Sequence, residues 1–277
     1  MRFRLLALDA DGTTLDDSAA VRPAVRGAVR DAGDRGVHVV LCTGRRYRTS
    51  LPILQELGIE SGAAVLQNGV LVKDVRSGET LHHRYLSREV YPEVLDVMRG
   101  VGAPLVYVDH HHEGLDFVTE APERAHPFQG EYVGRNQRVC RVVDSLDPAP
   151  SDALVMMSCL ADELSLRALE SEIATALGTR IRTNFLVNKN YRGHILEAVS
   201  AGSGKWPALV QLAAGMGIEP AEILAIGDDT NDAEMLAGAG LGVAMANAVP
   251  QALAAADHVT ASNSEDGVAR AIERFLL

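Results

Sequence analysis

The sequence predicts an α/β protein in which a doubly wound, mostly parallel sheet forms a core and a second α/β domain is inserted into that core. Near both ends of the chain, short apolar runs the length of buried strands alternate with helical segments. This alternation indicates right-handed crossovers, which make neighbouring strands parallel. Between about residues 84 and 194 the pattern changes to short helices and strands separated by charged and proline-containing loops. We therefore expect a discontinuous core.

The N-terminal part of the core is expected to hold strands and helices in alternation. Each strand is an apolar run that a polar cluster ends, which is typical of buried parallel strands. The strands are expected at residues 3–8, 37–42 and 63–66. One helix is expected over residues 23–35, where Pro23 suits the first turn, and another is expected to end near Gly58.

The parallel pattern returns after Lys205. Further core strands are expected at residues 223–226, 241–245 and 258–259. In the inserted part, helices are expected at residues 89–99 and 163–177, and strands at 105–108 and 154–159. The predicted core is therefore residues 1–82 and 196–277, and the predicted inserted domain is residues 83–195.

Composition and charge restrict the functions that this chain can have. Of its 277 residues, 47% are hydrophobic and 23% charged, the balance of a folded globular protein. The 26 basic and 37 acidic residues give a formal net charge of −11, which argues against nucleic acid or an anionic membrane as the main partner. A small phosphorylated substrate is still compatible with this charge, because a metal ion held by carboxylates can reverse the local field.

Cysteine and hydropathy patterns indicate a reduced, cytoplasmic setting. Cys42, Cys140 and Cys159 are scattered, odd in number and without metal-ligand spacing. Such usage is typical of a reducing compartment. The N-terminal apolar run stops at Asp9, which is too early for a signal-peptide core. The apolar stretch 236–256 is broken by glycines and a proline, so we expect no membrane span.

Asp9 and Asp11 follow the first expected strand and stand before Gly12, which permits a tight turn. In open parallel sheets, ligands bind beyond the carboxyl ends of the strands. A carboxylate there can attack phosphorus and form an acyl phosphate, while a second carboxyl protonates the leaving oxygen and later deprotonates water. The alternative is that these aspartates only form a turn or cap a helix, which is common after a strand.

Two further polar clusters follow expected strands and should meet Asp9 at the same sheet edge. Thr43 and Gly44 could hold a phosphoryl oxygen through a hydroxyl and backbone N–H groups, although Thr43 could equally be an ordinary N-cap. The acid-rich segment from Asp228 to Asp232 suits Mg²⁺, which prefers carboxylates together with substrate oxygens and water. A solvated acidic loop, however, needs no metal.

Lys205 stands at the end of a flexible glycine- and serine-containing segment, just before a helix. A lysine there could neutralise a phosphate group or the aspartyl nucleophile. Taken alone, it could as readily be a surface lysine. The interpretation of Lys205 as a functional residue depends on its position in the sequence relative to the other clusters.

In their order along the chain, the clusters of Asp9, Thr43, Lys205 and Asp228 resemble the four motifs of the haloacid dehalogenase superfamily. More narrowly, they resemble those of the Cof-type sugar-phosphate phosphatases. That group inserts a large α/β cap between its second and third motifs. The resemblance covers nearly the whole chain, including Asn68, Gly69 and the segments 242–248 and 264–268. It implies a Rossmann-like core, a substrate-selecting cap, and Mg²⁺-dependent hydrolysis of small phosphomonoesters through an aspartyl-phosphate intermediate.

The resemblance implies a role for each matching aspartate. Asp9 is expected to be the nucleophile and a metal ligand. Asp11 is expected to be the general acid/base, and to bind the metal through its backbone carbonyl. Asp228 is the third expected protein ligand of the Mg²⁺ ion, and Asp232 is expected to support Lys205 or the metal shell.

The resemblance also implies which groups hold the phosphoryl oxygens. These are Thr43, the Gly44 amide and Asn231, with Lys205 beside them. One departure concerns the residue after the lysine, which relatives usually have as glycine and which is Trp206 here. Trp206 either alters the fit of the substrate or packs outward.

The middle of the chain gives no specific site. Asp109 and the three consecutive histidines that follow it are expected to form a surface loop, because adjacent histidines cannot readily converge on one ion. Substrate contacts and ordinary solvated residues are equally good interpretations of Arg124, His126, Arg182, Asn184 and Lys189.

The leading functional hypothesis is hydrolysis of a small phosphomonoester, such as a sugar phosphate or a related metabolite. A phosphomutase of the same superfamily is one rival. A non-catalytic protein that senses a phosphorylated metabolite is another, and it is disfavoured because Asp9, Asp11, Lys205 and Asp228 are all present.

Overall fold

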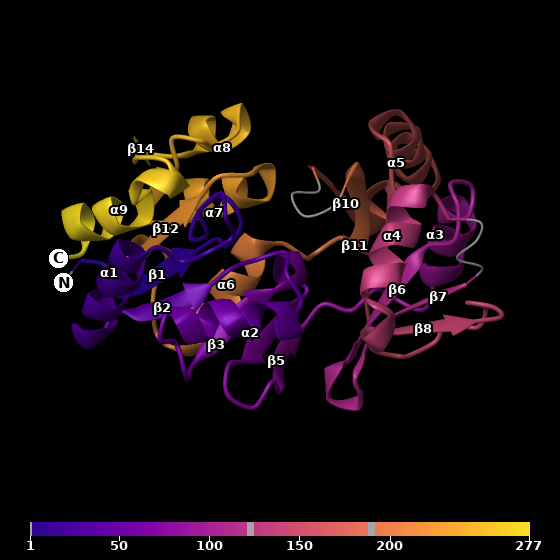
Figure 1. Cartoon of the computed structure of the whole chain (residues 1–277), viewed down its shortest axis with the longest axis horizontal. Helices are drawn as coiled ribbons and strands as arrows, with labels where there is room; N and C mark the ends of the chain where they lie inside the picture. The colour runs from indigo at the N-terminus through magenta and orange to yellow at the C-terminus, as the bar shows by residue number, and fades with distance from the viewer. Residues whose placement is uncertain (1, 121–124, 188–191) are drawn as a thin grey trace. The chain divides into compact units, whose positions relative to one another are not determined.

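The computed structural model describes residues 2–120, 125–187 and 192–277 of the chain (Figure 1). The chain divides into two compact units. Unit 1 comprises Met1–His83 and Gly204–Leu277, and unit 2 comprises Arg84–Ser203. Each unit has its own sheet and its own hydrophobic core. Within the described ranges, no helix is long and apolar enough to cross a membrane.

Unit 1 is built on a parallel sheet with the strand order β14-β13-β12-β1-β2. Its strands are β1 (Leu5–Leu8), β2 (His38–Leu41), β12 (Ile223–Gly227), β13 (Leu241–Ala244) and β14 (His258–Val259). The central strands β1, β12 and β13 are buried along their whole length. Their continuous apolar sequence is explained by this burial on both faces of the sheet.

The chain winds outward from β1 in both directions. It first reaches β2 and then β3 (Ala63–Leu66), which joins the sheet edge through a parallel bridge between Cys42 and Val65. After unit 2 it enters β12 on the other side of β1 and continues to β13 and β14. The strand order therefore reverses between β1 and β12. This doubly wound topology confirms the predicted fold class and makes that junction the expected ligand edge.

Helices connect the strands of unit 1. They are α1 (Pro23–Asp34), α2 (Tyr47–Glu56), α6 (Lys205–Gly215), α7 (Ala233–Gly238), α8 (Pro250–Ala255) and α9 (Gly267–Phe275). In α1, the buried residues Val25, Ala28, Val29 and Ala32 follow the three- and four-residue spacing of a single helix face. Pro23 stands in the first turn, where its missing N–H leaves no bond unmade.

Unit 1 also contains an antiparallel sheet, β3-β4-β5, that the sequence does not predict. Its further strands are β4 (Leu71–Asp74) and β5 (Thr80–His83). Both are short and mix apolar with charged or histidine residues, so neither shows a clear period. The chain reverses between β3 and β4 through Gln67, Asn68 and Gly69, which all have positive φ values, of 48°, 55° and 82°.

Unit 2 contains a six-stranded sheet in the order β10-β11-β9-β6-β7-β8. Its strands are β6 (Leu105–His110), β7 (Leu115–Glu120), β8 (Cys140–Val143), β9 (Leu154–Ala161), β10 (Ile181–Val187) and β11 (His194–Ser200). Neighbouring strands are antiparallel except for β7 and β8. Its helices are α3 (Tyr91–Met98), α4 (Pro127–Arg135) and α5 (Glu163–Leu177).

The second boundary between the units differs from the predicted one. The sequence places it after residue 195, which is inside β11. Because β11 pairs with β9 on one side and β10 on the other, its residues belong to unit 2. The chain returns to unit 1 at Gly204. The apolar run of β11 carries no local signal of which sheet it joins, and this explains the difference of eight residues.

Candidate active site

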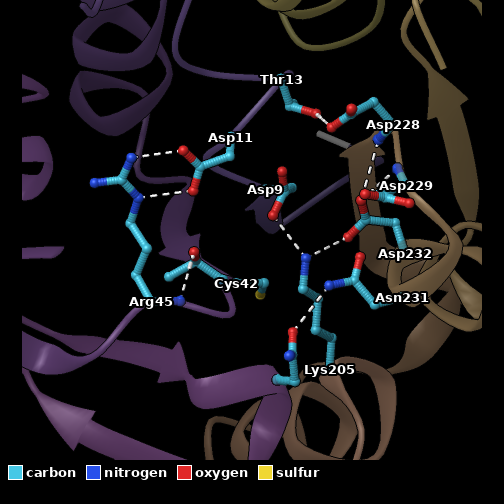
Figure 2. A network of polar contacts seen from close by, with 12 residues as sticks. Asp9, Asp11, Thr13, Cys42, Arg45, Lys205, Asp228, Asp229, Asn231 and Asp232 are labelled. Atoms are coloured by element: carbon cyan, nitrogen blue, oxygen red, sulfur yellow. Dashed lines mark hydrogen bonds and ion pairs between the residues drawn. The ribbon is translucent and has the colours of Figure 1, made fainter. Parts of the chain in front are cut away.

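Two acidic segments meet where the strand order reverses between β1 and β12 (Figure 2). Asp9 directly follows β1 and Asp228 directly follows β12. Since these strands are parallel and paired in register from Leu5 with Ile223, their carboxyl ends lie side by side. Asp9 is 5% exposed and Asp228 is 4% exposed. The topology thus brings together two clusters that are more than two hundred residues apart in the sequence.

Lys205, the first residue of α6, lies between two carboxylates. Its Nζ donates to Asp9 Oδ1 at 2.6 Å and to Asp232 Oδ1 at 2.6 Å. Burial by itself lowers the pKa of this ammonium, but the charges of Asp232 and Asp9 outweigh burial and hold the pKa above its ordinary value. Lys205 is therefore a permanent positive charge in contact with Asp9, and the interpretation as a surface lysine is wrong.

Asp9 has a strongly acidic surrounding. Burial raises the pKa of its carboxyl well above the ordinary value, Lys205 opposes this rise, and Asp232 and Asp228 add to it. Asp9, Asp11, Asp228 and Asp232 carry four formal negative charges against the two positive charges of Lys205 and Arg45, which leaves a formal charge of −2 for these six groups. The site therefore has an excess of negative charge where a cation would be stabilised.

Asp232 supports both the loop of Asp228 and the side chain of Lys205. Its Oδ2 accepts from the backbone N–H of Asp228 at 3.1 Å and of Asp229 at 3.0 Å, while Oδ1 accepts from Lys205. A Cβ on Gly227 would come within 2.6 Å of Asp232, so glycine at this position permits the close approach. One buried carboxylate thus fixes two elements of the site.

Thr13 and Thr14 tie the loop after β1 to its surroundings. Thr13 Oγ1 donates to Asp228 Oδ1 at 2.8 Å, and Thr14 Oγ1 donates to the Asp9 backbone carbonyl at 2.6 Å. Both threonines are 1% exposed. Thr13 therefore connects the loop after β1 to the loop after β12, and Thr14 holds the loop after β1 to its own strand end.

Asp9, Asp228 and Asp232 form the group best placed to hold a metal ion. One carboxylate oxygen from each lies within 4.8 Å of the others. Both oxygens of Asp232 already accept hydrogen bonds, so Asp9 and Asp228 are the better ligands. The side chain of Asp11 is engaged elsewhere, as described below for Arg45. A donor set made only of oxygens fits a hard cation such as Mg²⁺.

Arg45 binds Asp11 in a bidentate ion pair (Figure 2). Arg45 Nε donates to Asp11 Oδ2 at 2.7 Å, and Arg45 Nη2 donates to Asp11 Oδ1 at 2.5 Å. The carboxylate of Asp11 raises the pKa of Arg45, which keeps the guanidinium charged. The sequence prediction gives Arg45 no role, and only its place beside Gly44 could have indicated one.

The predicted phosphoryl-binding residues gather around Asn68. Asn231 Nδ2 donates to Asn68 Oδ1 at 2.9 Å, and a Cβ on Gly44 would lie 3.0 Å from that same oxygen. Thr43 is 1% exposed, and its Oγ1 accepts from the Arg45 N–H at 3.1 Å. Asn68 is therefore a site residue that the predicted set lacks. Its signal in the sequence was an Asn-Gly pair one residue after the end of a strand.

Trp206 packs against the core of unit 1. A Cβ on Gly238 of α7 would collide with the indole ring, so the ring lies directly against the backbone of that helix. Trp206 also adjoins the buried hydrophobic cluster of this unit. The ring therefore packs into unit 1, an arrangement that neither of the two interpretations left open by the sequence describes.

Asp109 and His110, expected in a surface loop, are the last residues of strand β6, and His111 and His112 begin the turn that follows it. His110 lies 2.9 Å from Glu113 Oε1 through Nδ1 and 2.8 Å from Ser151 Oγ through Nε2. Across the described residues, the aspartate group in unit 1 is the only set of three metal-ligating side chains found. Among the polar residues considered as substrate contacts, Asn184 donates to Glu197 Oε2 at 3.1 Å within the unit 2 sheet. Two of the polar residues considered from the sequence lie outside the described residues: Arg124 and Lys189.

Comparison with known proteins identifies the class. The family model of haloacid dehalogenase-like hydrolases matches residues 6–272. The chain therefore belongs to this family, which confirms the resemblance inferred from the four motifs. It is an enzyme, a phosphoric monoester hydrolase of the haloacid dehalogenase type.

Its relatives cover nearly the whole chain. YxeH of Bacillus subtilis (strain 168), a phosphatase by name, is 32% identical over 277 residues, with 99% of each chain covered. YwtE of the same organism, a 5-amino-6-(5-phospho-D-ribitylamino)uracil phosphatase, is 27% identical and covers 99% of this chain and 98% of its own. The crystal structure of a haloacid dehalogenase-like hydrolase from Bacteroides thetaiotaomicron is similar, with a TM-score of 0.82 and 28% identity over 99% of this chain and 100% of that one.

Proposed function

We propose that this enzyme is a Mg²⁺-dependent phosphatase that hydrolyses small phosphomonoesters, such as sugar phosphates and related metabolites, through an aspartyl-phosphate intermediate. The observation that carries the proposal is the buried contact between Asp9 and Lys205 at the point where the strand order reverses. A carboxylate held by a cation at the ligand edge of a parallel sheet is well placed to attack a bound phosphate ester.

In the first step, an oxygen of Asp9 attacks phosphorus, and the bond between phosphorus and the leaving oxygen breaks. Lys205 donates to Oδ1 of Asp9, so it orients the carboxylate and leaves the other oxygen for attack. The charge of Lys205 also stabilises the negative charge of the transferring phosphoryl group. We propose that Thr43, the Gly44 amide and Asn231 hold the phosphoryl oxygens.

Asp11 is the proposed general acid/base. Its proton passes to the leaving oxygen as the phosphorus–oxygen bond breaks. In the second step, water attacks the phosphorus of the aspartyl phosphate and gives a proton to Asp11, and the bond between phosphorus and the Asp9 oxygen breaks. Inorganic phosphate then leaves, and Asp9 and Asp11 return to their starting states.

We assign the Mg²⁺ ion to Asp9, Asp228 and the backbone carbonyl of Asp11. The excess of carboxylates over cations and the oxygen-only donor set support this assignment. A bound Mg²⁺ ion would neutralise charge on the phosphoryl group. Asp232 then acts as a support for Lys205 and for the loop of Asp228.

Unit 2 is the proposed cap, and it would select the substrate. The name of YwtE describes a phosphate ester on a ribityl chain, which supports a polyol or sugar phosphate as the substrate class here. A phosphomutase would use the same nucleophile and return the phosphoryl group to a bound sugar. We place the enzyme in the cytoplasm, and its free cysteines, Cys42, Cys140 and Cys159, support a reducing compartment.

A panel of phosphomonoesters tests the proposal. We expect the wild-type enzyme to release phosphate with Mg²⁺ present, to stop when EDTA removes the metal, and to resume when Mg²⁺ is restored. The variant Asp9→Asn keeps the size of the side chain but removes the nucleophile, so its kcat should fall on the order of 10³-fold or more. Phosphate release in stopped assays measures both effects.

Other outcomes would decide among the alternatives. Equal, slow phosphate release by the wild type and Asp9→Asn would contradict the aspartyl-phosphate mechanism. Turnover that requires a bisphosphorylated sugar would favour the phosphomutase. Binding without turnover across the whole panel would favour a sensor.

A further inference from the structure

We propose that Arg45 is a positioning residue for Asp11, and that it holds this carboxyl ready for proton transfer to the leaving group. This inference rests on the proposed function, because it concerns the general acid/base of that reaction. Arg45 stands at the end of the cluster that contains Thr43 and Gly44, and the sequence assigns it no role in the reaction.

Arg45 contacts Asp11 through two parallel hydrogen bonds, which we call the fork. The guanidinium donates to Oδ2 of Asp11 at 2.7 Å and to Oδ1 at 2.5 Å, so both oxygens of the carboxylate face one planar cation. Planar, paired hydrogen bonds fix the orientation of a carboxylate more tightly than a single point charge can. The side chains of Arg45 and Asp11 are 22% and 30% exposed, so a ligand can still reach them.

The backbone on both sides of the fork is anchored. The N–H of Arg45 donates to Thr43 Oγ1 at 3.1 Å, and its carbonyl accepts from the N–H of Gln67 at 3.1 Å. Next to Asp11, the carbonyl of Gly12 accepts from Asn247 Nδ2 at 2.8 Å. The ion pair therefore connects two ordered loops, and the direction of the Asp11 carboxyl is set by more than its own rotamer.

The fork suits the proton transfer that Asp11 is proposed to make. When the Asp11 proton passes to the leaving oxygen, the product is a carboxylate, which a charged fork stabilises. The proton that Asp11 takes from water in the second step sits on one of its oxygens, which then leaves the fork and faces the leaving oxygen, while the other oxygen keeps its bond to Arg45.

The test compares substrates that differ in their need for an acid. The phenolate of p-nitrophenyl phosphate leaves with little help, whereas the alkoxide of an alkyl or polyol phosphate needs a proton. With Arg45→Gln, we expect kcat/KM for an alkyl phosphate to fall about 10²-fold or more, and kcat/KM for p-nitrophenyl phosphate to fall less than about 10-fold. The ratio kcat/KM is the correct measure because it ends at the first phosphoryl transfer.

Three variants complete the design. Asp11→Asn should show the same substrate dependence, and adding Arg45→Gln to it should cause no further loss, because the two residues act as one unit. Arg45→Lys keeps the charge without the fork and should restore only part of the alkyl-phosphate activity. Arg48→Gln, at an exposed arginine in the same region, should keep the wild-type ratio between the two substrates.

An equal loss on both substrates would overturn the inference and would place Arg45 on the phosphoryl group itself. Unchanged kinetics would overturn it as well. If the wild type turned over neither substrate, the proposed function would fail, and the role of Arg45 would fail with it. Thermal melting of each variant checks that the fold is intact.

Discussion

At the residue scale, the candidate site depends on buried charges that each have a defined partner. Lys205 and Asp232 are at most 2% exposed, and Lys205 bonds both Asp232 and Asp9. Burying an ion costs a large desolvation free energy unless a group of opposite charge lies in contact with it. The sequence shows a lysine after a flexible segment, and only the contacts show that it is inside the protein.

Lys205→Met should therefore damage both stability and activity. The change leaves Asp9 and Asp232 buried without their shared cation, so the free energy of unfolding should fall by about 3–5 kcal/mol. Loss of a charge that stabilises the phosphoryl group should lower kcat by about 10²-fold or more. Urea unfolding and phosphate-release assays measure the two effects.

Lys73→Met is a matched control, because Lys73 is also 2% exposed. Its Nζ donates to the Gly78 carbonyl at 3.2 Å and to Thr80 Oγ1 at 2.7 Å, within the antiparallel sheet of unit 1. We expect it to lose stability while keeping kcat near the wild-type value. A similar loss of kcat in both variants would show that Lys205 affects activity only through the fold.

At the element scale, the loops after the strands decide where the reactive groups lie. The turn between β3 and β4 places Asn68 against Gly44 and Asn231. It also brings Gly69 so close to Gly204, the residue before α6, that a Cβ would collide with the carbonyl oxygen of Gly204. The start of α6, and with it Lys205, is therefore packed against this turn.

Gly69→Ala should disturb the site more than Gly58→Ala does. Both Gly69 and Gly58 have positive φ values, of 82° and 75°, but a Cβ at Gly58 would meet nothing within 4 Å. Gly58→Ala should therefore cost only the backbone penalty of about 1–2 kcal/mol. We expect Gly69→Ala to cost more in chemical unfolding and to lower kcat, while Gly58→Ala keeps kcat. Equal losses of stability and full activity in both would contradict this packing.

The start of α1 is tied to the start of α9 by an ion pair that should respond to pH. Arg22 Nε donates to Asp266 Oδ1 at 2.6 Å. The hydrogen bond from Arg22 lowers the pKa of Asp266. A carboxyl with a lowered pKa in the folded state adds stability above its unfolded pKa of about 3.9, and loses that contribution as pH falls through the folded value.

Asp266→Asn should lower the Tm at pH 7, and the difference from the wild type should shrink as the pH falls through the folded pKa of Asp266. Asparagine tolerates the left-handed backbone at this position, where φ is 61°, so the change tests the charge rather than the turn. Thermal melts over a series of buffers measure the difference. A difference that stays constant down to the acid limit would show that the ion pair is not its cause.

At the scale of the whole molecule, the two units differ in how they use the chain. The hydrophobic cluster of unit 2 is complete between Leu86 and Ala198. The cluster of unit 1 combines residues from both of its segments, from Leu5 to Val72 and from Ala208 to Ala252. Unit 2 is therefore continuous in sequence, whereas the core of unit 1 forms only when its two separate segments of the chain pack together.

Residues 84–203 expressed alone should fold, since their six-stranded sheet and core need no residue of unit 1. A cooperative thermal transition and well-dispersed amide signals in NMR would show this. Residues 1–83 alone should not fold, because β1 would lose β12 and the apolar faces of α6 and α7. A cooperatively folded fragment 1–83 would contradict this account of the core.

Much of the fold follows from local patterns. The strands expected at 63–66 and 258–259 and the helix expected at 163–177 agree with the observed elements. The antiparallel sheet containing β4 and β5 could not be predicted, since these strands mix apolar residues with charged residues or histidines, whereas β3 is entirely apolar. The place of β11 depends on its partners, which are distant in the sequence.

The sequence by itself determined the order of the motifs, the alternation of strands and helices, and the membership in a family of hydrolases. These properties are local, or are sums of local properties. Only the tertiary structure decided that Arg45 forms an ion pair with Asp11 and that Asn231 donates a hydrogen bond to Asn68. It also decided that Lys205 is buried and that Trp206 packs on Gly238. Each of these contacts links residues far apart in the chain, and their side chains acquire partners only when the strands and loops that carry them are brought together.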